Sequence, residues 1–124
     1  MKAVRGFFWA VLATLAVGYT LRAPILSGGS LGVIDAIDGR LMQACWEHVY
    51  LSIRGEADFF SPQWFSPIDH TLGYTDTFLI NGLVYSVFRY YGVVPLQAMV
   101  LTIGFYALLG FAGFYLMLQR LKIA

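Results

Sequence analysis

Residues 95–118 lie within the longest part of the chain without a charged side chain, and this segment most constrains the fold. A transmembrane α-helix needs about 20 consecutive apolar residues, which this segment provides. Pro95 suits the first turn of a helix, where its missing N–H is not needed. Arg120 and Lys122 follow and can reach the membrane–water interface. The pattern predicts a membrane-spanning helix over 95–118.

The composition supports a membrane protein. Hydrophobic residues make up 59% of the chain and charged residues only 12%, whereas a soluble domain carries roughly 25% charged residues. The formal net charge of +1, without a long Lys/Arg cluster, gives no electrostatic basis for binding nucleic acid. Cys45 is the single cysteine, so the chain has no internal disulfide and no cysteine-based metal motif.

A second uncharged segment, 6–21, follows Lys2 and Arg5 and can extend to residue 26. Its length favours a retained transmembrane helix over 6–26. The alternative is a cleaved signal peptide, because Ala16 and Gly18 fit the small-residue cleavage pattern.

The region between these segments contains two further helical patterns. In 38–54 the apolar residues recur every four positions opposite a polar face, which predicts an amphipathic helix with Asp38 as its N-cap. Trp46 and Tyr50 on this helix suit the headgroup level of a membrane. A second helix is expected over 75–90, with Gly92 just past its end.

Lysine and arginine positions set the expected topology. Lys2 and Arg5 favour a cytoplasmic N-terminus, and Arg120 and Lys122 favour a cytoplasmic end for the last helix. The expected fold is an all-α membrane protein with two transmembrane helices joined by an external loop, 27–94, that carries two juxtamembrane amphipathic helices. Because the chain stops soon after an apolar run, we expect it to be the N-terminal portion of a longer polytopic protein.

Three short motifs carry a resemblance to a known family. They are "DAIDGRL" from Asp35, the Glu47-His48 pair, and "SPIDHTLGYTDTFL" from Ser66. In this order, between two spans, they resemble the N-terminal part of the GT-C superfamily of integral-membrane glycosyltransferases. The similarity is closest to bacterial polytopic membrane proteins described as 6-pyruvoyl-tetrahydropterin synthase-related or YfhO-like. The resemblance implies a bacterial inner (plasma) membrane location and transfer of a sugar from a polyprenyl-phosphate-linked donor.

The resemblance also implies a set of site residues. A carboxylate at the membrane surface can act as a general base or hold a cation beside the donor phosphate. The expected catalytic residues are Asp35, Asp38, Asp76 and His48. The expected substrate-binding residues are Arg40, Glu47 and His70. A divalent cation, Mg²⁺ or Mn²⁺, is a possible cofactor whose ligands the sequence does not identify.

Each of these residues also has a structural alternative. Asp38 and Asp76 suit helix caps, Asp35 suits a solvated loop, and the two histidines suit packed positions. Arg40, Arg54 and Arg89 suit contact with lipid headgroups. Three function classes therefore stay open: part of a glycosyltransferase, a non-catalytic two-span subunit or scaffold, and, least favoured, a fragment of a transporter. Expected partners are the lipid bilayer, a lipid-linked sugar donor, and further transmembrane helices of a longer chain or of partner subunits.

Overall fold

The computed structural model describes residues 2–27, 38–74 and 78–121. All regular secondary structure in these residues is helical, which confirms the all-α class. The helices are α1 (Lys2–Thr20), α2 (Arg22–Leu26), α3 (Asp38–Ile53), α4 (Leu79–Tyr90) and α5 (Pro95–Arg120), with two 3-10 turns, η1 (Gln63–Phe65) and η2 (Thr71–Tyr74), between α3 and α4.

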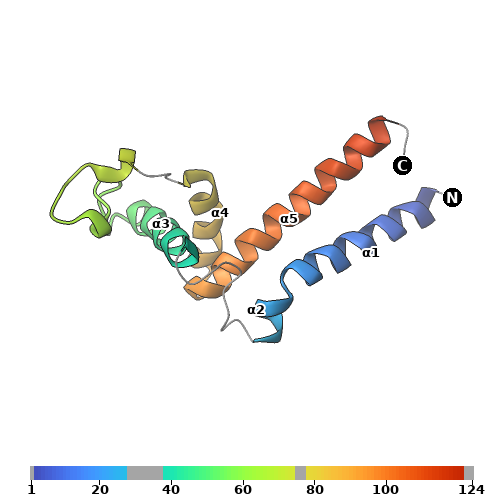
Figure 1. The fold of residues 1–124 in the computed structure, drawn as a ribbon, viewed down its shortest axis with the longest axis horizontal. Coiled ribbons are helices and arrows are strands. Elements are labelled where there is room, and N and C mark those ends of the chain that lie inside the picture. The colour runs from blue at the N-terminus through green and yellow to red at the C-terminus, as the bar shows by residue number, and fades with distance from the viewer. Residues whose placement is uncertain (1, 28–37, 75–77, 122–124) are drawn as a thin grey trace.

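The two longest helices, α1 and α5, lie side by side and antiparallel (Figure 1). Trp9 of α1 packs against Phe111 and Tyr115 of α5, with ring centroids 6.3 and 5.4 Å apart. Both termini lie at one end of this pair, while α3, α4 and the loop between them lie at the other end (Figure 1). We call α3, α4 and residues 54–74 the cap.

Of the described residues, only α5 forms a helix that is both long and apolar enough to cross a membrane. The apolar part of α1, Gly6–Thr20, is shorter than a full span. The prediction of one continuous helix over 6–26 is wrong, because the helix breaks at Leu21 before α2 begins. Pro24 explains the break, since it has no N–H to donate to the Thr20 carbonyl and its ring crowds that oxygen. A second crossing stays a prediction.

The core lies where α3, α4 and α5 meet. Trp46 of α3 and Tyr85 of α4 are fully buried, with ring centroids 5.9 Å apart, and Met99 of α5 completes the contact. Trp46 and Tyr50 are both covered by protein, so neither side chain faces lipid headgroups. The depth of α3 relative to a membrane stays a prediction. Protein covers the middle of the apolar face of α3, whereas Leu41 and Ile53 at its two ends are exposed.

α4 begins at Leu79, later than the predicted helix over 75–90. Phe78 adopts a left-handed conformation with φ 45°, which an α-helix cannot continue through. The predicted cap residue Asp76 lies outside the described residues. At the other end, Gly92 has φ 82°, and the N–H groups of Gly92 and Val93 donate to the carbonyls of Arg89 and Phe88. This Schellman motif satisfies the last carbonyls of α4 and turns the chain toward α5.

Helices α3 and α4 approach each other closely at Gly82. A Cβ atom at this position would lie 2.8 Å from Cβ and Cγ2 of Val49, closer than van der Waals contact allows. Glycine is required at this position because a side chain would collide with Val49. The backbone conformation is not the reason, since Gly82 has no positive φ.

We predict that Gly82→Ala destabilises the cap by about 1–3 kcal/mol, the usual result of overpacking a close interface. The measurement is denaturant unfolding of the protein in detergent, followed by tryptophan fluorescence. Gly110→Ala is the matched control, because nothing lies within 4 Å of a Cβ at Gly110. Equal stability of the two variants would contradict the proposed close approach.

Candidate functional site

A bidentate ion pair joins α3 to α4 at the centre of the cap. Arg89 Nη2 donates to Glu47 Oε1 at 2.8 Å, and Arg89 Nε donates to Glu47 Oε2 at 2.9 Å. Arg89 Nη1 also donates to the Val93 carbonyl at 2.7 Å, which ties the pair to the turn that leads into α5. The side chains are only 19% and 24% exposed, so the pair is largely shielded from water.

Two tyrosines enclose this ion pair. The Tyr85 hydroxyl donates to Glu47 Oε2 at 2.5 Å, and the Arg89 guanidinium lies over the Tyr50 ring, 5.0 Å from its centroid. Burial of the Glu47 carboxyl favours its neutral form, but the hydrogen bonds from Arg89 and Tyr85 and the charge of Arg89 outweigh burial and lower its pKa. Glu47 is therefore held as a carboxylate, and its oxygens are occupied by partners within the protein.

His48 faces the loop rather than the ion pair. Its Nε2 lies 3.0 Å from the Phe59 carbonyl oxygen, and because a carbonyl only accepts, Nε2 must carry the hydrogen. Its ring meets Trp64 edge-on, with centroids 5.4 Å apart. The side chain is buried. Glu47 and His48 are adjacent in sequence, yet one holds α4 and the other holds the loop.

Asp38 and Arg40 lie exposed in the first turn of α3. A carboxylate suits this position because it faces the positive end of the helix dipole. At 1.5 Å per residue, Asp38 and Glu47 lie about 13 Å apart along α3, too far to act on one reacting atom.

The remaining predicted site residues join neither the Glu47–Arg89 ion pair nor the exposed pair Asp38 and Arg40. His70 is exposed on the loop, where its backbone N–H donates to Ser61 Oγ at 3.1 Å. Asp35 and Asp76 lie outside the described residues. Within 2–27, 38–74 and 78–121, no three His, Cys, Asp or Glu side chains gather where they could hold a metal ion. The expected catalytic and substrate-binding roles of the seven residues stay predictions.

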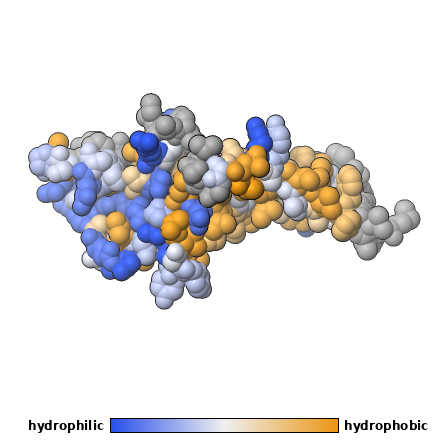
Figure 2. All heavy atoms as spheres, turned by 90° about the horizontal axis from the view of Figure 1, so that it is seen from below, coloured by the Kyte–Doolittle hydropathy of each residue, from blue (hydrophilic) through white to orange (hydrophobic). Residues whose placement is uncertain are grey.

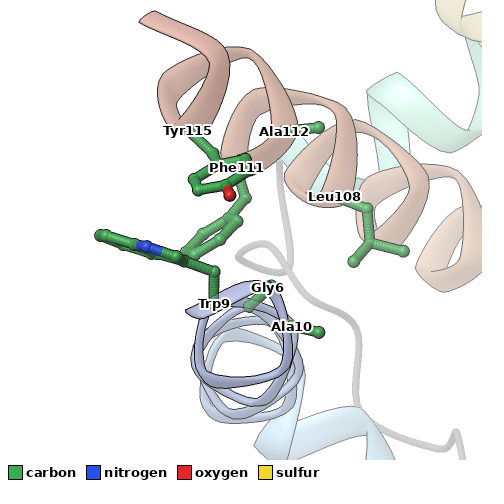
Figure 3. Close-up of a pocket in the computed structure, with 8 residues that line it drawn as sticks. Gly6, Trp9, Ala10, Leu108, Phe111, Ala112 and Tyr115 are labelled. Carbon is green, nitrogen blue, oxygen red and sulfur yellow. The ribbon is translucent and has the colours of Figure 1, made fainter. Parts of the chain in front are cut away.

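An apolar groove runs between α1 and α5 (Figure 3). Its volume is about 400 Å³, and small residues of α1 form one wall. Trp9 points out from α1 toward Phe111 and Tyr115 of α5 and closes one side of the groove (Figure 3). The lining residues are Gly6, Trp9, Ala10, Ala13, Leu108, Phe111, Ala112 and Tyr115.

The sequence alone does not predict the Glu47–Arg89 pair. It predicts instead that Arg89 contacts lipid headgroups. That interpretation is wrong, because all three guanidinium nitrogens bond within the protein. One signal pointed to the pair: an arginine within an apolar helix needs a compensating charge, and acidic residues are few in this chain. Arg54 differs, since it stays about half exposed beside Glu56 at 2.7 Å.

Comparisons of the chain with protein-family models, with curated proteins and with solved structures found no match.

We predict that the Glu47 interaction stabilises the fold above pH 4.5, the carboxyl's ordinary pKa, and is lost as the pH falls through its lower folded value. The sign follows because the unfolded chain binds the proton more readily than the folded chain does. The measurement is the melting temperature of the parent and of Glu47→Gln between pH 7 and pH 3. The difference should correspond to about 1–3 kcal/mol near neutral pH and shrink in acid. A difference that does not depend on pH would contradict this assignment.

We predict that His48→Ala loosens the loop, because it removes the hydrogen bond to Phe59 and the contact with Trp64. The measurement is hydrogen exchange of residues 58–72, which should become faster. His48→Gln is the control, since its amide nitrogen can take the place of Nε2 and should restore much of the protection. If both variants exchange like the parent, His48 does not hold the loop.

Proposed function

We propose that this chain is the N-terminal membrane unit of a GT-C-like glycosyltransferase. In this proposal α1 with α2, and α5, cross the bacterial inner membrane. The termini face the cytoplasm and the cap lies on the external side. The cap presents carboxylates to a polyprenyl-phosphate-linked sugar donor. The observation that carries the proposal is the antiparallel pair of apolar helices, α1 and α5, with the polar cap at one end.

Three observations support the membrane part. The long apolar helix α5 is mostly uncovered. Only 17% of its most apolar stretch is buried, whereas the core helix of a soluble protein is mostly buried. Large apolar side chains such as Phe7, Leu15 and Leu116 are exposed along α1 and α5. Hydrophobic residues gather over this half of the molecule, and hydrophilic residues gather over the cap (Figure 2). Such a surface is stable against lipid and unstable in water.

The orientation follows from the arrangement of the two ends. Lys2 and Arg5 belong to the first turn of α1 and Arg120 ends α5, and these helix ends lie opposite the cap (Figure 1). Basic residues favour the cytoplasmic side, so the cap falls on the external side, where a lipid-linked donor would present its sugar. The groove between α1 and α5 and the uncovered glycines Gly110 and Gly113 fit contact with further transmembrane helices.

For the chemistry, the proposal relies on the carboxylates at and just before the start of α3. Glu47 is bound to Arg89 and Tyr85, so it serves the cap itself. Asp38 and Arg40 are exposed at the start of α3, with Asp35 close by in sequence. In the proposed mechanism Asp35 or Asp38 removes the proton from the acceptor hydroxyl or holds the divalent cation, Arg40 assists at the donor phosphate, and Asp76 is a partner from the second loop.

A non-catalytic two-span subunit or scaffold is the second candidate. One observation favours it: Glu47 and His48, two residues of the expected site, make contacts that hold the cap together. In that case the exposed carboxylates only stabilise helix ends and keep the surface soluble.

We predict that Asp35→Ala, Asp38→Ala or both lower sugar transfer by at least about 100-fold, the usual loss when a general acid or base is removed. The assay uses the longest natural form of the protein in membranes, with a radiolabelled polyprenyl-phosphate sugar and a check of the folded protein level. Glu56→Ala is the matched control, because Glu56 is an exposed carboxylate at the opposite end of α3. If both aspartate variants transfer sugar like the parent, or if the parent itself transfers none, the result supports the non-catalytic subunit or scaffold.

A further inference from the structure

The exposed face of α4 consists of apolar and aromatic side chains alone. Five residues of α4 are exposed: Leu79, Ile80, Leu83, Val87 and Tyr90. The polar members of the same helix, Asn81, Ser86 and Arg89, are buried or half-buried. This pattern is the reverse of a surface helix in a soluble protein, which turns its apolar side to the core and its charged side to water.

α3 gives an internal comparison, because it packs on the same core. Its exposed residues are mixed, with Asp38 and Arg40 beside Leu41 and Ala44. The uniform apolar face of α4 is therefore a property of that helix and not of the cap as a whole. We call Ile80, Leu83, Val87 and Tyr90, which recur at helical spacing, the α4 stripe.

The α4 stripe is joined to the surface of the proposed span. The Tyr106 hydroxyl of α5 donates to the Ile80 carbonyl at 3.2 Å, which places the start of α4 beside Tyr106. At 1.5 Å per residue, Tyr106 lies roughly 16 Å along α5 from Pro95. Leu109 and Phe114 of α5, three and eight residues beyond Tyr106 and therefore on the same side of that helix, are exposed. The apolar surface of α5 beyond Tyr106 thus begins next to the start of the α4 stripe.

The other end of α4 carries features of a membrane boundary. Tyr90 and Tyr91 are both about 80% exposed, and their rings lie edge-to-face with centroids 5.7 Å apart. Tyrosine is enriched where a helix leaves the membrane, because its ring is apolar and its hydroxyl is polar. The charge of Arg89 in this helix is balanced by Glu47 on the protected side.

We infer that the α4 stripe contacts the acyl chains of the bilayer leaflet nearest the cap, so that α4 is inserted beside α5 while α3 lies above the membrane. The occupant is lipid because the stripe is uncharged and begins next to the apolar surface of α5. This inference rests on the proposed membrane anchoring. It adds that one of the two helices expected on the membrane surface enters the bilayer.

The test uses the full chain in membrane vesicles with one added cysteine at a time. Leu83→Cys and Val87→Cys report on the α4 stripe, Ala44→Cys on the exposed face of α3, and Leu108→Cys on α5. The parent chain is the blank for the buried Cys45. Two readouts are taken: the labelling rate with a charged, membrane-impermeant maleimide in opened vesicles, and quenching of an attached bimane fluorophore by lipids with nitroxide-labelled acyl chains.

The expected result is labelling at least about tenfold slower at 83 and 87 than at 44, because a thiol in apolar surroundings forms little thiolate. Nitroxide lipids should quench 83 and 87 and leave 44 bright. Fast labelling at 83 and 87 with slow labelling at 108 overturns this inference alone. Fast labelling at 108 as well overturns the membrane anchoring. Slow labelling without quenching at 83 and 87 means that protein covers the stripe, which also overturns the inference.

Discussion

The bidentate bond between Glu47 and Arg89 is the interaction on which the cap depends. It joins residues 42 positions apart and fixes α3 against α4 beside the close approach at Gly82. The third hydrogen bond of Arg89, to the Val93 carbonyl, extends this constraint to the turn before α5. One arginine thus links α3, α4 and the turn that leads into α5. An arginine without its carboxylate in this position would be a buried, uncompensated charge, which is strongly destabilising.

The sequence anticipated the elements whose signals are local. The uncharged segment 95–118 lies within α5, and the four-residue periodicity from Asp38 matches α3, which ends at Ile53. Two local features were underestimated. Pro24 breaks the first helix because it removes a backbone donor, and the left-handed Phe78 delays the start of α4 to Leu79. The second is hard to foresee, since a left-handed conformation at phenylalanine has no clear sequence signal.

The features that the sequence did not reveal depend on tertiary contact. An amphipathic pattern shows that α3 has an apolar side, but not whether lipid or protein covers it. Trp46 and Tyr50 were assigned to the membrane surface for that reason, and they are instead buried. The same limit applies to Glu47 and Arg89, whose partnership crosses two helices and a long loop. Of the expected site residues, Asp38 and Arg40 remain exposed at the start of α3, while Glu47 and His48 stabilise the cap.

Taken together, these contacts divide the molecule into two regions with different surroundings. The α1–α5 pair has an uncovered apolar surface and carries both termini at its far end, and the cap gathers the shielded ion pair and the polar loop (Figures 1 and 2). This separation is the physical basis for placing the first region in a bilayer and the second at its surface. The proposed function would use both regions, because the lipid part of the donor would lie beside the first and its sugar beside the second.

Placement of the two regions relative to the membrane can be tested directly with two matched variants in sealed membrane vesicles of known orientation. Gln63→Cys lies on the exposed loop of the cap, and Gln119→Cys lies exposed in the last turn of α5. A membrane-impermeant maleimide is applied from each side in turn. The account predicts that position 63 reacts only from the external side and position 119 only from the cytoplasmic side. Reaction of both positions from the same side would contradict a crossing by α5, and with it the membrane arrangement proposed for the whole chain.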